Sequence, residues 1–257
     1  ANRYLGETID IHSGGQDLIF PHHENEIAQS EAANGKPFAR YWLHNGFINI
    51  DNEKMSKSKG NFFTVRDIAK EYDYEVIRFF MLTAHYRSPI NFSAELLEQA
   101  KTALNRIYEC RDNMLFLLSN SENAGTDSEI VEKLTQYRTK FIEAMEDDIN
   151  TADALAAIFE LVREINTVIG SDVPPGKGTI EKAYELLTEL TGILGILSKK
   201  HDDNIDQNVK ALIEERQKAR AEKNYKRADE IRDQLNEMGI ELQDTPHGVK
   251  VVYKNRL

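Results

Sequence analysis

The sequence is short of the features that mark secreted and membrane proteins. Its 257 residues include one cysteine, Cys110, so no disulfide framework can form within the chain. No run of about 18 apolar residues occurs, which excludes a transmembrane helix of the usual length. The N-terminus lacks both an initiator methionine and the pattern of a signal peptide. We therefore expect a cytoplasmic protein, or a piece of one, that does not enter a membrane.

Positive charge is also scarce, but unevenly so. The chain has 32 Lys and Arg against 43 Asp and Glu, a formal net charge of −11. Residues 205–257 hold 11 Lys and Arg against 10 Asp and Glu, so all of the acidic excess lies upstream. This balance argues against indiscriminate nucleic-acid binding. It leaves the C-terminal part as a region to which an RNA can be drawn.

What the chain does contain is a change of pattern along its length. Residues 1–92 mix strand and helix signals, with short strands at 9–11 and 47–50 and a helix over 65–81 that breaks near Asp73. From residue 93 the apolar residues recur with period 3.6 in four stretches, which predicts a four-helix bundle. Polar breaks at 120–128, 148–151 and 171–178 separate these helices.

The last fifty residues form a third pattern. Two helices are expected at 206–222 and 225–238, with Gly239 ending the second. Two strands follow at 240–242 and 249–253, and residues 244–248 should form the hairpin loop between them. The polar stretch 201–204 is expected to be a linker.

The strongest chemical signal is the string KMSKS at residues 54–58. Lysines on flexible stems supply mobile positive charge for the β and γ phosphates of a nucleotide, and serine hydroxyls add donors. For an arbitrary run of this composition, a solvated basic loop is the better interpretation. This string, however, matches the signature loop of the class I aminoacyl-tRNA synthetases.

A second signal is FPHHENE at residues 20–26. If Pro21 opens a helix, His22 and Glu26 lie one turn apart on the same face. Imidazole and carboxylate at that spacing can both ligate one metal ion. From composition alone, a capped helix start without any metal is the better interpretation.

A third signal is DIHSGGQD at residues 10–17, a strand that runs into two glycines and an acidic residue. Gly14 and Gly15 allow a ligand to approach the backbone closely, and the Asp17 carboxylate can accept ribose hydroxyls. By itself this stretch is better interpreted as a plain loop.

Taken together, in order and spacing, these motifs resemble cysteinyl-tRNA synthetase, a class I aminoacyl-tRNA synthetase. The stretches YWLH at 41–44, FFTVRD at 62–67 and HYRS at 85–88 continue the match, and the resemblance covers essentially the whole chain. Other class I synthetases share KMSKS but not FPHHENE. The family attaches cysteine to its tRNA through a cysteinyl-adenylate, and a zinc ion selects cysteine by ligating its thiolate.

The resemblance implies a role for individual residues. His22 and Glu26 would be zinc ligands, and His12 would lie in the amino-acid pocket. Gly14, Gly15 and Asp17 would bind ATP, a substrate that arrives with Mg²⁺. Lys54 and Lys57 would be catalytic, with Lys57 also contacting the phosphates of ATP. Cys110 lies on a helix stripe and is expected to be buried core rather than a metal ligand.

The same resemblance implies that half of the catalytic domain is missing. The chain has no His-Ile-Gly-His signature, and the family's two cysteine zinc ligands fall upstream of its first residue. We expect a C-terminal portion that is inactive alone and that binds zinc weakly or not at all. The expected fold is mixed and mostly helical. The expected parts are the second half of a Rossmann-type ATP domain with the KMSKS loop (1–68), a stem-contact segment (69–92), a helical tRNA-binding bundle (93–204) and a small α/β anticodon-binding domain (205–257).

In this interpretation the C-terminal domain reads the tRNA for cysteine, and the protein is a monomer. Arg220, Asp229 and Asp244 match anticodon-contacting positions, since arginine offers a fork to guanine and carboxylates accept from base amino groups. The acidic run 146–148 is expected to face away from phosphate or to bind nothing. From charge alone, an ordinary charged helical hairpin is equally compatible. Two alternative functions are a mycothiol-pathway cysteine ligase, which lacks such an end, and a non-enzymatic tRNA-binding module.

Overall fold

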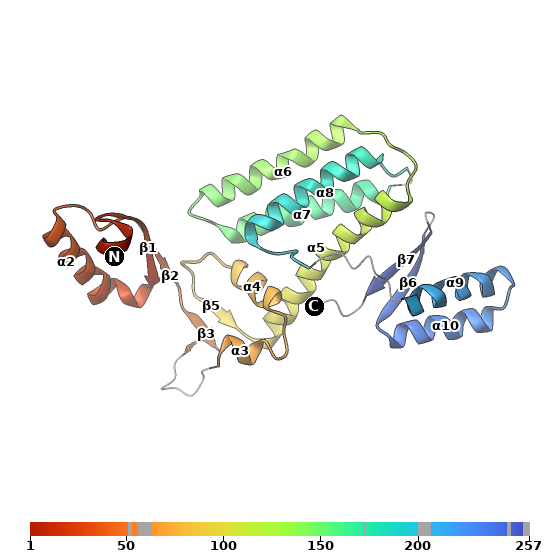
Figure 1. Cartoon of the computed structure of the whole chain (residues 1–257), viewed down its shortest axis with the longest axis horizontal. Coiled ribbons are helices and arrows are strands. Elements are labelled where there is room, and N and C mark those ends of the chain that lie inside the picture. Colours follow the sequence, from red (N-terminus) through yellow and green to blue (C-terminus); the bar gives the residue numbers. More distant parts are fainter. Residues whose placement is uncertain (51–52, 56–62, 172, 200–206, 246–247, 254–257) are drawn as a thin grey trace. The chain divides into compact units, whose positions relative to one another are not determined.

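The computed structural model describes residues 1–50, 53–55, 63–171, 173–199, 207–245 and 248–253 (Figure 1). The chain divides into two compact units. The first comprises residues 1–101 and 140–156, and the second comprises residues 102–139 and 157–257. Among the described helices, none combines the length and the apolar character that a membrane span requires.

The N-terminal part of the first unit is a strand–helix–strand arrangement. Strands β1 (Ile9–Gly15) and β2 (Ala39–Asn45) pair in parallel, from Ile9 opposite Ala39 to Gly15 opposite Asn45. Both strands therefore end at the same edge of the sheet, where ligands bind in open α/β folds. The helical segments around them are α1 (Asn2–Leu5), η1 (Gln16–Leu18), η2 (Ile19–His23) and α2 (Glu24–Asn34).

The remainder of the first unit is built on a second small sheet. Its strands are β4 (Glu53–Lys54), β3 (Ile48–Ile50) and β5 (Ile90–Phe92) in that order, with β3 parallel to β5 and antiparallel to β4. The helix expected over 65–81 is present as α3 (Val65–Ile68) and α4 (Tyr74–Leu82), which confirms the break near Asp73. Asp73 begins α4 by accepting a hydrogen bond from the Glu75 amide at 2.9 Å.

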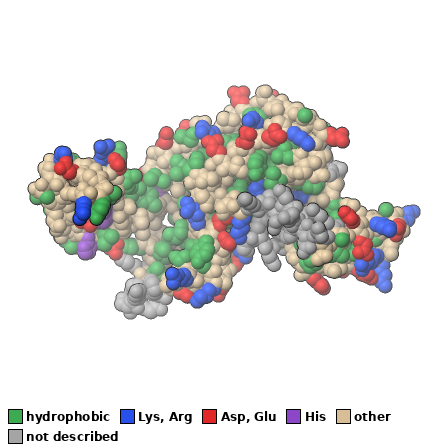
Figure 2. Space-filling view, viewed as in Figure 1, with side chains coloured by type: hydrophobic (Ala, Val, Ile, Leu, Met, Phe, Trp, Pro, Cys, Tyr) green, Lys and Arg blue, Asp and Glu red, His purple; other side chains and the backbone are tan. Residues whose placement is uncertain are grey.

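The four long helices predicted downstream are present as α5 (Ala94–Asn120), α6 (Ser128–Glu146), α7 (Thr151–Ile169) and α8 (Lys177–Leu194). In the second unit, fully buried side chains come from each of them, for example Tyr108, Leu134, Leu161 and Leu187. Outside this core, Lys and Arg are interspersed with Asp and Glu on the visible helix surface (Figure 2). Burial of one apolar stripe per helix is what the 3.6-residue period predicts.

Cys110 is buried within this bundle, as expected from its place on the stripe. None of its surface is exposed, and its thiol lies 4.0 Å from the Val162 carbonyl oxygen. Burial raises the pKa of this thiol to about 12, because the thiolate would lose its hydration.

We therefore expect native protein at pH 7.5 to resist alkylation of Cys110 by iodoacetamide, because only the thiolate is nucleophilic. Unfolding the same sample in urea should restore the labelling rate of a free thiol, which mass spectrometry can follow. Equal labelling rates in the native and unfolded samples would contradict the buried position.

The described C-terminal part is a helical hairpin followed by a β-hairpin. Helices α9 (Gln207–Ala221) and α10 (Tyr225–Glu237) pack with strands β6 (Ile240–Thr245) and β7 (Gly248–Tyr253). The core consists of Val209, Ile231, Leu235 and Ile240. Gly239 has φ 76°, in keeping with its predicted helix-ending role. The predicted loop 244–248 is too long, because Asp244 pairs with Val249 and Thr245 with Gly248 in the antiparallel ladder.

Candidate active site

The two predicted glycines lie at the carboxyl end of β1, where the absence of a side chain allows close packing. A Cβ atom on Gly14 would approach the His23 ring to 2.8 Å, and one on Gly15 would approach the Asp17 carboxylate to 2.5 Å. Gly14 therefore lets the ring of His23 pack against the strand. Gly15 lets Asp17, in η1, fold back toward the strand end. The structure thus brings Gly14, Gly15 and Asp17 together as the sequence predicts.

Beside them is a cluster of histidines with one carboxylate. His12 Nε2 lies 2.7 Å from Glu26 Oε2, and the His12 and His23 ring centroids are 4.9 Å apart. Ligand atoms of His12, His23 and Glu26 all lie within 4.8 Å of one another. The remaining predicted residue, His22, is exposed and does not belong to this group of three. Figure 2 shows histidine side chains in purple on the part of the molecule that carries α2.

His44, at the end of β2, orients the buried His23. The His23 Nδ1 and His44 Nε2 atoms are 2.8 Å apart. Burial lowers the pKa of His44, and the charges of His23, His12 and Arg87 lower it further. A neutral His44 can share one proton with His23. That hydrogen bond uses Nδ1 of His23. The other ring nitrogen of His23, Nε2, takes no part in it.

This donor set suits zinc. Two imidazole nitrogens and one carboxylate oxygen make up a common catalytic zinc site. A hydrogen bond from the other ring nitrogen, as between His23 and His44, is the usual support for a ligating histidine. The sequence interpretation named Glu26 and His12 but not His23 and His44, which the structure brings beside them. The missing signal is the parallel register, which pairs His12 with Trp42 and puts His44 on the same face of β2 as Trp42.

The basic loop is described only at its start. The backbone of Lys54 ends β4, opposite Asn49 of β3. Lys57 lies outside the described residues. The pairing of β3 with β4 therefore sets the backbone position of residue 54, and these two strands follow β2 directly in the chain.

The three residues predicted to contact bases lie in the C-terminal part. Arg216 donates to both oxygens of Asp244 at 3.2 and 3.1 Å, and Arg220 also donates to this carboxylate. These hydrogen bonds, chiefly that from Arg216, lower the pKa of Asp244. Asp229 lies on α10, where its carboxylate is 3.5 Å from Arg232. Arg220 and Asp244 are thus in direct contact, and the nearly buried Arg216 binds the same carboxylate.

Three family models match this chain one after another. Residues 1–102 match the class I (C) tRNA synthetase catalytic domain, residues 140–198 match the DALR domain, and residues 202–251 match the cysteinyl-tRNA ligase anticodon binding domain.

Whole-chain relatives agree with these models. The cysteine–tRNA ligase of Clostridioides difficile is 55% identical over 253 residues, covering 97% of this chain and 54% of that protein. The enzyme of Caldicellulosiruptor saccharolyticus is 55% identical over 254 residues, covering 98% of this chain and 54% of the relative. The chain therefore spans about half the length of the curated relatives it matches.

A solved structure supports the fold. The ternary complex of Agrobacterium radiobacter K84 agnB2 LeuRS with tRNA and LeuAMS superimposes with a TM-score of 0.59 at 18% identity. The match covers 72% of this chain and 25% of that one. At this identity the likeness concerns architecture alone, and it is the architecture of a class I synthetase. With three consecutive domain matches and 55% identity over nearly its whole length, the chain belongs to the cysteinyl-tRNA synthetase family.

Proposed function

We propose that the chain is part of an ATP-dependent cysteine–tRNA ligase. The observation that carries the proposal is the grouping of His12, His23 and Glu26 beside the Gly14–Gly15 strand end. Nitrogen and oxygen atoms that would suit a thiolate-binding metal lie there next to a backbone edge that would receive a nucleotide. Amino acid and ATP must meet at such a junction for an adenylate to form.

At this junction Gly14 and Gly15 would admit the adenosine, and Asp17 would accept its ribose hydroxyls. His12 would line the amino-acid pocket, where its 2.7 Å contact with Glu26 fixes the ring. Lys54 and Lys57 would stabilise the charge that develops as pyrophosphate leaves ATP, which is bound with Mg²⁺. These assignments follow the motif resemblance residue by residue.

Zinc is the metal that this donor chemistry favours. When bound, it would ligate the thiolate of cysteine and reject serine, whose hydroxyl is a poor zinc ligand. The motif proposes His22 and Glu26 as ligands, whereas the geometry groups Glu26 with His12 and His23. Glu26 belongs to both sets. Its carboxylate would have to give up its hydrogen bond with His12 before it could ligate a metal ion.

The C-terminal part would bind the tRNA for cysteine. Arg220, Asp229 and Asp244 are the proposed base contacts. A base that approaches Asp244 must compete with Arg216 and Arg220 for the same carboxylate. The presence of this domain favours a tRNA ligase over a mycothiol-pathway cysteine ligase. We also propose a cytoplasmic monomer.

The proposal is tested with the protein encoded by the complete reading frame. We expect cysteine, but not serine, to support exchange of pyrophosphate into ATP, and we expect charging of the tRNA for cysteine. The 257-residue chain alone should bind that tRNA and show no exchange. Transfer of cysteine to a small-molecule acceptor in place of tRNA would support the mycothiol-type enzyme, whereas tRNA binding without exchange by the complete protein would support a non-enzymatic module.

A further inference from the structure

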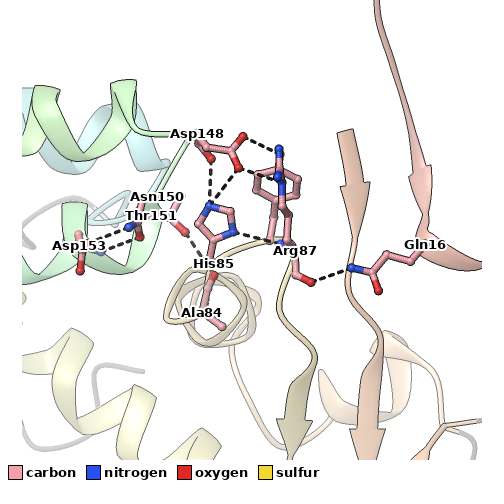
Figure 3. A network of polar contacts seen from close by, with 9 residues as sticks. Gln16, Ala84, His85, Arg87, Asp148, Asn150, Thr151 and Asp153 are labelled. Atoms are coloured by element: carbon pink, nitrogen blue, oxygen red, sulfur yellow. Dashed lines mark hydrogen bonds and ion pairs between the residues drawn. The ribbon is translucent and has the colours of Figure 1, made fainter. Parts of the chain in front are cut away.

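The segment between α4 and β5 holds one acidic residue from the corner between α6 and α7 (Figure 3). His85 Nε2 lies 3.1 Å from the backbone oxygen of Asp148, and the Tyr86 hydroxyl donates to Asp148 Oδ1 at 2.8 Å. Arg87 Nε lies 2.8 Å from Asp148 Oδ2. Three consecutive residues thus converge on Asp148, and both of its carboxylate oxygens are engaged.

The same segment also contacts the candidate active site. The side-chain amide of Gln16, the first residue after β1, donates to the Arg87 carbonyl at 3.0 Å. The Gly46 amide, directly after β2, donates to the Tyr86 carbonyl at 2.8 Å. A Cβ on Gly46 would lie 2.4 Å from the backbone of Ser88, so the contact requires glycine. The carboxyl ends of both parallel strands are therefore tied to residues 86–88.

The corner that presents Asp148 is held in an unfavourable backbone conformation. Asp148 and Ile149 both have φ 56°. The left-handed region is unfavourable for a non-glycine residue and is least suited to a β-branched one. Ile149 is 44% exposed, so burial of its side chain does not account for the conformation. What the conformation achieves is to direct Asp148 at His85, Tyr86 and Arg87.

A role in stability alone does not explain this arrangement. The Arg87 and Asp148 side chains are 59% and 38% exposed, and an ion pair at that exposure contributes little to stability. Its geometric effect is larger, because the same Arg87 residue whose guanidinium binds Asp148 offers its carbonyl to Gln16. Gln16 separates Gly15 from Asp17, two of the three residues proposed to receive the nucleotide.

We propose that Asp148 is a positioning residue for the nucleotide edge: through Arg87 and Gln16 it sets the turn that follows β1. The inference rests on the proposed function for its catalytic consequence. The structural link itself, from Asp148 to the turn at residues 15–17, does not depend on that function.

The test uses the complete enzyme with Asp148→Asn, which removes the charge but suits a left-handed backbone, and with Asp147→Asn as control. Asp147 is the adjacent exposed carboxylate, so the control makes the same change in charge. We expect Asp148→Asn to raise the KM for ATP about tenfold in pyrophosphate exchange. The KM for cysteine and the melting temperature should stay near wild type, and Asp147→Asn should change none of them.

Gln16→Ala provides the second arm, because it removes the link at its other end. It should also raise the KM for ATP, and the double variant should be no worse than the worse single variant. Additive effects would overturn the proposal. So would an Asp148→Asn enzyme that matches Asp147→Asn, or one that loses stability and affinity for both substrates alike.

Amide hydrogen exchange separates this inference from the proposed function. Exchange at residues 14–18 should be faster in Asp148→Asn than in wild type or Asp147→Asn, whether or not the protein activates cysteine. If the wild-type protein does not activate cysteine but this difference is present, the proposed function fails and the link stands. Unchanged exchange at residues 14–18 in active enzyme overturns the link and leaves the function intact.

Discussion

Replacing Glu26 with alanine is expected to abolish tight zinc binding and, with it, activation of cysteine. Glu26 is the acidic member of the group with His12 and His23, and it is also the acidic member of the His22–Glu26 pair proposed from the sequence. Mutation of a residue that merely supports a metal ligand typically weakens binding by about 10–100-fold. Loss of a ligating carboxylate should therefore weaken zinc binding by about 100-fold or more, with at least a similar loss in kcat/KM for cysteine.

The measurement is a competition titration of zinc against a chromophoric chelator, followed by pyrophosphate exchange, on the complete protein. The Glu26 side chain is 47% exposed, so the variant should keep its circular dichroism spectrum and melting temperature. Stoichiometric zinc that survives chelator competition in Glu26→Ala would contradict the prediction.

Three histidine variants then decide which ring nitrogens accompany Glu26. If the motif is right, His22→Ala behaves like Glu26→Ala, and His12→Ala keeps its zinc. If the group seen in the structure is the site, His12→Ala and His23→Ala lose zinc, and the exposed His22 is dispensable. His44→Ala should weaken zinc binding in the second case, because it releases the Nδ1 atom of His23 from its 2.8 Å hydrogen bond.

Much of the fold could be predicted because its signals are local. The helix stripes, the break at Asp73 and the Gly239 stop each depend on residues within a few positions of one another. The start of α6 is equally local, since Asp127 Oδ1 accepts from the amides of Glu129 and Ile130 at 3.0 and 3.1 Å. The end of the β-hairpin was misjudged because Asp244 and Thr245 favour turns in isolation, whereas cross-strand pairing extends them here.

The parts of the site that sequence could not reveal depend on pairing across distance. His23 and His44 become neighbours only through the β1–β2 register and the start of α2. The acidic run 146–148 has no local sign of a partner, and yet Asp148 binds residues more than 60 positions away. No periodicity encodes such contacts, because they arise only when separate elements fold together.

The second large effect is expected in the C-terminal part, where Asp244→Ala should lower the free energy of unfolding. Only 9% of the Arg216 side chain is exposed, and it donates to both oxygens of Asp244. Removing the carboxylate leaves a buried guanidinium without its counter-ion. Because Asp244 itself is 46% exposed, water can partly replace it, and we expect a loss of about 2 kcal/mol.

The matched control is Asp229→Ala, which removes a second carboxylate of the same domain. Its side chain is 62% exposed and lies 3.5 Å from Arg232, an ion pair of the kind that contributes less than about 1 kcal/mol. Urea unfolding of the two variants at pH 7 should show a clearly larger shift for Asp244→Ala. Equal shifts would mean that Arg216 finds another partner when Asp244 is removed.

The pH dependence of this difference provides an independent check, and its sign follows from the lowered pKa of Asp244. The unfolded carboxylate titrates near pH 4. A folded-state pKa below that value stabilises the fold above about pH 4, and the stabilisation disappears as the pH falls through the folded pKa. The difference between wild type and Asp244→Ala should therefore be full at pH 7 and shrink steadily below pH 4. A difference that stays constant on acidification would show that the stabilisation comes from packing of the Asp244 side chain rather than from its negative charge beside Arg216 and Arg220.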